Sequence, residues 1–177
     1  MGSSPISVPL LLLQINSVIG FKAVPPGTDQ KMPGTFEKDG WIYWPHTRKH
    51  YKLVRREATQ PEAKADCRRM NGTLVKIDSY DENMFLYEHS KEPKVDDGKW
   101  RFDHFLWIGL EMRCAKWTAT TGEKITYFNW GEREPNKYIL PENCVVCDQL
   151  IGDWCSTQWI DLQCDKKAAG YWCQRSF

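Results

Sequence analysis

Residues 59–72 place apolar side chains at helical spacing behind a strong start signal. Thr59 precedes Pro61 and Glu62, the order of an N-cap threonine, a first-turn proline and a capping-box glutamate. The apolar residues that follow recur every three to four positions, which is the period of one helix face. The pattern therefore predicts a helix that ends near Gly72 and carries Cys67 on its inward face.

A second helix is expected shortly afterwards. Ser79 and Glu82 again stand three residues apart, as an N-cap residue and its partner do. The helical period continues to about His89, and it directs Phe85 and Leu86 into the core.

Strands are expected on either side of these helices. Residues 51–54 and 74–77 are short, apolar and rich in β-formers, which is typical of strands. Nine Trp and seven Tyr in 177 residues also favour a compact, loop-rich β core, because indole and phenol groups combine large apolar surfaces with a polar atom that needs a partner. Helices combined with such a core make an α+β fold.

The N-terminal 38 residues differ in character. The apolar run 6–20 contains four consecutive leucines but is too short and too interrupted to span a bilayer. Residues 1–20 are therefore interpreted as a secretory signal peptide cleaved after Gly20, although no basic residue precedes the run. Residues 21–38, rich in Pro and Gly, are interpreted as a linker, and 39–177 as one secreted, extracellular domain. A disordered N-terminal tail is the alternative.

Charge excludes one class of partner. The formal net charge is +1, and basic residues are interspersed with acidic ones, so we expect no nucleic-acid partner. With the short apolar run assigned to a signal peptide, we also expect no membrane span.

Export would favour disulfide bonds among the seven cysteines. The spacing of Cys144 and Cys147 is that of half a structural zinc site. Zinc is disfavoured because Val145 and Val146 between them resemble a buried strand, and the remaining cysteines lack the spacing of a second half.

Oxygen-bearing side chains gather in the last third of the chain. Glu134 and Asn136 flank Pro135, Glu142 follows closely, and Asp161 stands three residues before a cysteine. Ca²⁺ takes roughly 6–8 oxygen ligands from carboxylates, amides, carbonyls and water. The cluster therefore predicts a site for a hard cation.

This order of motifs resembles the C-type lectin-like domain. The family signature has a Glu-Pro-Asn triplet, a later Glu, a Trp-Asn-Asp triplet and paired cysteines; residues 107–110 (Trp-Ile-Gly-Leu) and 127–130 (Tyr-Phe-Asn-Trp) match it further upstream. The resemblance covers roughly 39–177. It implies a C-type lectin-like fold in its short form, with two helices flanking small antiparallel sheets, a long calcium-site loop and stapling disulfides.

The resemblance also implies which cysteines pair. A third pair is assigned less firmly, and one cysteine is left to link two copies of the chain into a homodimer. The expected pairs are Cys67 with Cys173, Cys144 with Cys164 and, across an inserted turn, Cys147 with Cys155, leaving Cys114 unpaired.

At the site, the resemblance implies that Glu134, Asn136 and Glu142 direct oxygens at one Ca²⁺ ion. Asp161 adds its carboxylate and its backbone carbonyl. Two vicinal sugar hydroxyls would complete the coordination while hydrogen-bonding to the first three residues. The resemblance further implies a cis peptide before Pro135, and the Glu-Pro-Asn order is the version associated with mannose, N-acetylglucosamine and fucose.

Ile160 departs from the family pattern. It stands where the signature has Asn, so one metal oxygen and one hydrogen-bond donor to the sugar are missing. The expected function is that of a secreted, calcium-dependent lectin for mannose-type glycans with a weakened site. The alternative is a domain of the same fold that binds a protein partner without calcium or sugar.

Catalysis is not expected. Glu132, Glu134 and Glu142 are close in sequence, and paired carboxylates can hydrolyse glycosides. A glycosidase needs one protonated carboxyl, however, whereas a calcium site keeps its carboxylates ionised.

Asn71-Gly72-Thr73 is an acceptor triplet for N-linked glycosylation. The same residues also suit a helix C-cap, and the two interpretations are compatible.

Overall fold

The computed structural model describes residues 34–93, 104–137, 141–151 and 157–176. The predicted signal peptide, most of the predicted linker and Cys155 lie outside these residues. Within them, no helix is both long enough and apolar enough to cross a membrane.

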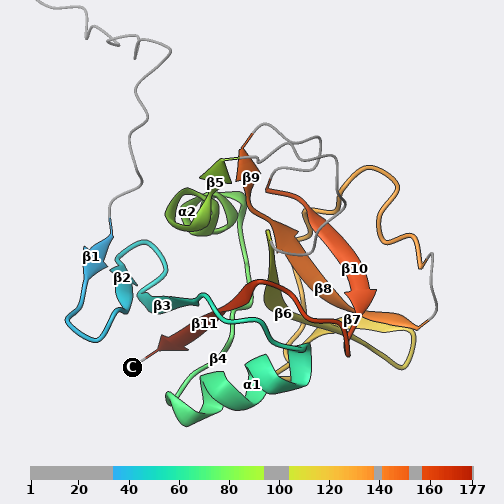
Figure 1. Cartoon of the computed structure of the whole chain (residues 1–177), viewed down its shortest axis with the longest axis horizontal. Helices are drawn as coiled ribbons and strands as arrows, with labels where there is room; N and C mark the ends of the chain where they lie inside the picture. Colours follow the sequence, from blue (N-terminus) through green and yellow to red (C-terminus); the bar gives the residue numbers. More distant parts are fainter. Residues whose placement is uncertain (1–33, 94–103, 138–140, 152–156, 177) are drawn as a thin grey trace, which may run out of the picture. The chain divides into compact units, whose positions relative to one another are not determined.

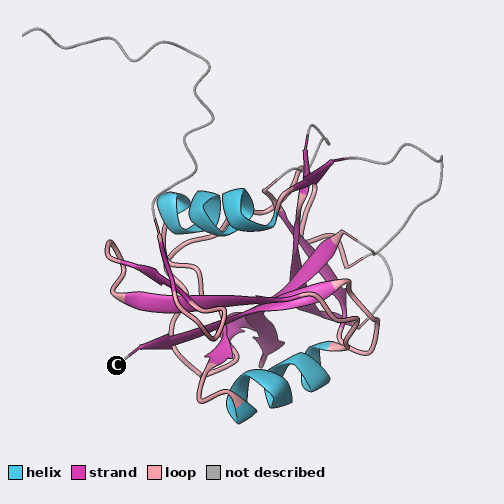
Figure 2. Cartoon of the chain, turned by 60° about the vertical axis from the view of Figure 1, so that its left-hand side comes forward, coloured by secondary structure: helices cyan, strands magenta, loops and turns pink. Residues whose placement is uncertain are grey.

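Both predicted helices are present. Helix α1 spans Gln60–Arg69 and begins with a complete capping box, in which Thr59 and Glu62 exchange hydrogen bonds. Helix α2 spans Tyr80–Ser90, and its N-cap Ser79 accepts a hydrogen bond from the backbone N–H of Glu82. The two helices lie on opposite sides of the strands (Figure 2).

The strands between them form a nine-stranded sheet with the order β1-β2-β3-β11-β6-β8-β10, to which β4 adds at β11 and β7 at β6 (Figure 1). A second, two-stranded sheet pairs β5 with β9. The strands are β1 (Thr35–Phe36), β2 (Ile42–Trp44), β3 (Lys49–Val54), β4 (Thr73–Leu74), β5 (Glu92–Pro93), β6 (Phe105–Arg113), β7 (Lys116–Ala119), β8 (Glu142–Asp148), β9 (Leu150–Ile151), β10 (Trp159–Gln163) and β11 (Gly170–Ser176).

Two features of the sheets differ from the expectation. The large sheet is mixed, not antiparallel, because β11 runs parallel to β6, with Gly170 opposite Leu106; β5 and β9 are also parallel. Strand β1 lies inside the range 21–38 that was expected to be a linker. The sheet therefore begins at Thr35, before the expected boundary at residue 39.

The core consists of two clusters of buried residues. One contains Trp159 and Trp172, and the other contains Trp107 and the disulfide-bonded Cys67 and Cys173. A second disulfide joins Cys144 to Cys164, so both firmly expected pairs are present. These bonds fasten α1 to β11 and β8 to the segment after β10.

The remaining described cysteines differ in exposure. Cys114 is exposed and Cys147 is buried, and among the described residues neither forms a disulfide. Burial raises the pKa of the Cys147 thiol well above its ordinary value, so this thiol stays protonated at neutral pH. Because Cys155 lies outside the described residues, its pairing with Cys147 stays a prediction.

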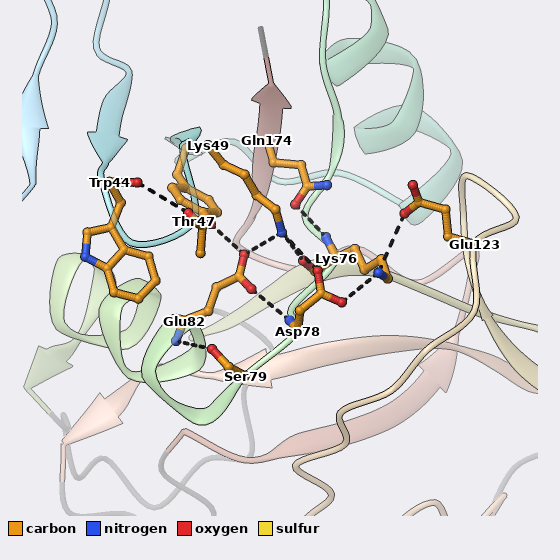
Figure 3. Close-up of polar contacts among 10 residues, drawn as sticks. Trp44, Thr47, Lys49, Lys76, Asp78, Ser79, Glu82, Glu123 and Gln174 are labelled. Carbon is orange, nitrogen blue, oxygen red and sulfur yellow. Dashed lines mark hydrogen bonds and ion pairs between the residues drawn. The ribbon is translucent and has the colours of Figure 1, made fainter.

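A buried ionic cluster ties β3 to α2 (Figure 3). The wholly buried carboxylate of Glu82 accepts hydrogen bonds from Lys49 Nζ at 2.9 Å and from Tyr51 Oη at 2.5 Å. Lys49 Nζ also pairs with Asp78 at 3.1 Å. Burial alone would lower the pKa of Lys49, but the charges of Glu82 and Asp78 raise it above its ordinary value. The ammonium group therefore remains charged inside the domain.

Candidate functional site

The candidate site lies on the connection between β7 and β8. Its central part is fixed to β10 by two backbone hydrogen bonds: the N–H of Trp159 donates to Asn129 at 2.8 Å, and the N–H of Gly131 donates to Trp159 at 2.9 Å. Trp130 and Trp159 also meet edge to face, with ring centroids 6.1 Å apart. The residues just before the Glu-Pro-Asn triplet are therefore held against a core strand.

The triplet itself forms a tight turn. The peptide between Glu134 and Pro135 is cis, as the resemblance implies. The flanking residues Arg133 and Lys137 both adopt left-handed conformations, with φ of 66° and 49°. The N–H of Glu134 donates to the carbonyl of Gly131 at 3.0 Å, which closes the turn.

Asn136 joins the loop to β10 and to its own neighbour. Its side-chain Nδ2 donates to Glu134 Oε1 at 2.6 Å, and its backbone N–H donates to Asp161 Oδ1 at 3.0 Å. The backbone N–H of Lys137 donates to the second oxygen of the same carboxylate at 3.1 Å. Three of the four expected metal ligands thus lie together, and Asp161 also anchors the loop.

The two carboxylates in this group influence each other. The pKa of Glu134 is raised to about 7, chiefly by partial burial and secondly by a hydrogen bond with Asp161 and the charge of that residue. Hydrogen bonds from Asn136 lower this pKa but do not cancel the rise. Two acidic groups held this close repel each other when both are ionised. A cation between them relieves this repulsion.

Glu142, the fourth expected ligand, is the first residue of β8 and is 7% exposed. Among the described residues, no group of three or more His, Cys, Asp and Glu side chains is arranged to hold a metal ion. Glu142 is therefore not in one acidic cluster with Glu134 and Asp161. Glu142 pairs with Gln163 of β10, beyond a β-bulge that interrupts the regular alternation between Glu142 and Cys144.

Ile160 lies directly opposite Val146 in the β8–β10 pairing. It is half-buried and packs against the core cluster that contains Val146 and Cys144. Its hydrocarbon side chain supplies no oxygen. The hydrocarbon of Ile160 thus stands where the family pattern would place an amide.

The side chains at the site offer the type of ligand atom that Ca²⁺ prefers. Glu134, Asn136 and Asp161 offer carboxylate and amide oxygens, which are ligands that hard cations prefer, and they offer no sulfur or imidazole. Both oxygens of Asp161 already accept backbone N–H groups, so this residue would use its remaining lone pairs for an ion.

The sequence reasoning missed the role of Gly131. A Cβ atom at this position would lie 3.3 Å from Glu134 Cγ and 3.5 Å from the backbone oxygen of Trp159. The Glu134 side chain therefore runs close over the glycine, where any larger residue would crowd it. The available signal was a glycine directly after a tryptophan, three residues before the triplet.

The chain matches a known family of domains. The model of the family described as "Lectin C-type domain" matches residues 56–175, more than half of the chain.

Among curated proteins, the chain is 30% identical over 155 residues to C-type lectin lectoxin-Phi2 of Philodryas olfersii, covering 85% of this chain and 88% of that protein. It is 29% identical over 137 residues to the low affinity immunoglobulin epsilon Fc receptor of Homo sapiens, covering 76% of this chain and 37% of the receptor.

Among solved structures, the cow C-type carbohydrate-recognition domain of CD23, determined in the presence of a GlcNAc2Man3 oligosaccharide, is similar with a TM-score of 0.64 and 26% identity. The match covers 82% of this chain and 98% of that domain. A calcium-independent type II antifreeze protein shares the fold with a TM-score of 0.62 at 20% identity, over 81% of this chain and 96% of its own.

Proposed function

Because the chain belongs to the C-type lectin domain family, we propose that it binds carbohydrate through one Ca²⁺ ion at the loop before β8. The observation that carries this proposal is the position of Asn136. Its side chain contacts the Glu134 carboxylate, and its backbone contacts the Asp161 carboxylate. Two carboxylates and one amide group thereby lie close together.

In this proposal, Glu134, Asn136 and Asp161 hold the ion, and Glu142 completes the set from the start of β8. An ion held there would supply direct coordination to two vicinal sugar hydroxyls. Glu134, Asn136 and Glu142 orient the sugar, because carboxylates accept hydrogen bonds from hydroxyls while the amide N–H donates one. The residues bind and orient the ligand and transfer no proton, so the proposed activity is binding and not catalysis.

The proposed sugar class is that of mannose, N-acetylglucosamine and fucose. Glu134 and Asn136 stand in the order associated with this class, and exchanging carboxylate and amide would reverse which hydroxyl each serves. Affinity should be modest because Ile160 contributes neither an oxygen nor an N–H donor.

We further propose that the chain is exported, glycosylated at Asn71 and partly dimeric. Asn71 is exposed at the turn after α1, with a left-handed φ of 57°. The exposed Cys114 lies in the turn of the β6–β7 hairpin. Two such thiols form a disulfide when oxygen or glutathione disulfide accepts their electrons and protons.

The second candidate function is a protein-binding domain that uses neither calcium nor sugar. Two observations favour it. Asp161 already uses both oxygens to anchor the loop, and the described residues hold no acidic group of three arranged for a metal. In this alternative, the side chain of Ile160 would be part of an apolar surface that contacts the protein partner.

A glycan array, probed with the secreted protein in calcium and again in a chelator, separates the two functions. The lectin function predicts signals on mannose-type and N-acetylglucosamine glycans that disappear with the chelator. An array without calcium-dependent signals would contradict it and leave the protein-binding function.

A further inference from the structure

Three aromatic side chains form a continuous row beside the candidate site. Trp117 of β7 packs on Trp130 with ring centroids 5.0 Å apart. Phe128 then stacks on Trp130 at 6.2 Å, with only 16° between the ring planes. We call Trp117, Trp130 and Phe128 the aromatic row.

The inner and outer parts of the aromatic row differ in burial. Trp117 and Trp130 are partly buried and pack against the core, whereas Phe128 is 44% exposed. An exposed phenyl ring is unfavourable in water because its apolar surface remains hydrated. Stacking on Trp130 nevertheless fixes the ring's orientation, so a flat apolar surface is presented to solvent.

The aromatic row is continuous with the proposed sugar site. Trp130 is followed directly by Gly131, over which the side chain of Glu134 runs, with Glu134 Cγ 3.3 Å from the position of a Cβ. The same segment is fixed to β10 by the hydrogen bond from Gly131 to Trp159. The apolar row and the acidic loop therefore form adjoining parts of one rigidly held segment.

We propose that the aromatic row is a second sugar subsite that takes the next residue of a β-linked N-acetylglucosamine chain, an inference that rests on the proposed function of the loop. All ring hydroxyls of this sugar are equatorial, so both ring faces present C–H groups and no hydroxyls. Such a face packs on an aromatic ring by dispersion and loss of apolar surface, without a hydrogen bond. The terminal sugar then occupies the loop, and its neighbour covers Phe128.

The test compares N-acetylglucosamine with its β1,4-linked trimer by calorimetric titration in calcium. The wild-type protein should bind the trimer about five- to tenfold more tightly than the monosaccharide, as expected from roughly 50 Å² of additional apolar contact. Phe128→Ala should lose this preference while its affinity for the monosaccharide stays unchanged.

Phe36→Ala is the matched control, since Phe36 is 61% exposed but lies on β1. It should keep the full preference for the trimer. Equal preference in wild type and Phe128→Ala, or no preference in wild type, would overturn the second subsite while leaving the loop site standing. If the wild type bound neither sugar, the proposed function would fail and the subsite with it.

Discussion

The Asp161 carboxylate accepts a hydrogen bond from the backbone N–H of Asn136 at 3.0 Å, which joins a buried core strand to an exposed loop. The same carboxylate accepts the N–H of Lys137. The loop is therefore positioned by protein groups alone. An ion at the proposed site would meet a loop that these hydrogen bonds already hold in place.

Replacing Asp161 with Ala should destabilise the domain. Asp161 is 2% exposed, and its loss leaves two backbone N–H groups without their acceptor. We expect the free energy of unfolding to fall by about 2–4 kcal/mol, the cost of losing two hydrogen bonds to a buried charged group. Urea unfolding in a chelator measures this. A change below about 0.5 kcal/mol would show that the anchor has no structural role.

The pH dependence of stability should reveal the Lys49–Asp78 contact. Burial alone would raise the pKa of Asp78, but hydrogen bonds from Lys76 and Lys49 bring it below its ordinary value of 3.8. A lowered folded-state pKa stabilises the fold fully above pH ~3.8, and this contribution is lost as pH falls through the folded value.

Thermal melts of wild type and Asp78→Asn should therefore differ at pH 6 and converge as the pH falls through the lowered folded-state pKa of Asp78. Because the Asp78 side chain is 36% exposed and solvent screens its charge, the difference at pH 6 should be small. A difference that persists unchanged at the lowest pH would refute the assignment.

Ile160→Asn should increase calcium affinity. Position 160 directly precedes Asp161 and is where the family signature has Asn, so an amide there would add an oxygen ligand to the proposed site. One such contact corresponds to about tenfold in affinity. The domain should also melt at a lower temperature, because a half-buried hydrocarbon is replaced by a polar group. Unchanged calcium affinity would favour the apolar-contact alternative.

Cys114→Ser should remove covalent dimers. Cys114 is exposed, whereas the other described unbridged cysteine, Cys147, is buried. Non-reducing electrophoresis of wild type that is expressed through a secretory pathway should show a dimer band that disappears on reduction. Cys147→Ser should retain the band, and a dimer that persists in Cys114→Ser would exclude this linkage.

Local features of the fold could be predicted because they depend on neighbours in sequence. The capping residues Thr59 and Ser79 placed both helices correctly, since N-cap hydrogen bonds reach only three residues ahead. The parallel pairing of β6 with β11 could not be predicted in this way. It depends on residues more than sixty positions apart and on the packing of both strands.

The candidate site was predictable in composition but not in arrangement. Oxygen-bearing side chains indicated Glu134, Asn136 and Asp161 directly. The anchoring of the loop on Asp161 uses backbone N–H groups, which every residue but proline carries, so the sequence gives no sign of it. The position of Glu142 depends on where β8 begins.

Calorimetric titration of calcium into wild type, Asn136→Ala and Asn136→Asp tests the central claim most directly. Alanine removes the side-chain oxygen but keeps the backbone bond to Asp161, whereas aspartate restores an oxygen ligand. We predict that wild type binds one Ca²⁺, that Asn136→Ala binds at least tenfold more weakly and that Asn136→Asp retains the affinity within about threefold. Absence of calcium binding in wild type, or equal binding by the alanine variant, would contradict the account.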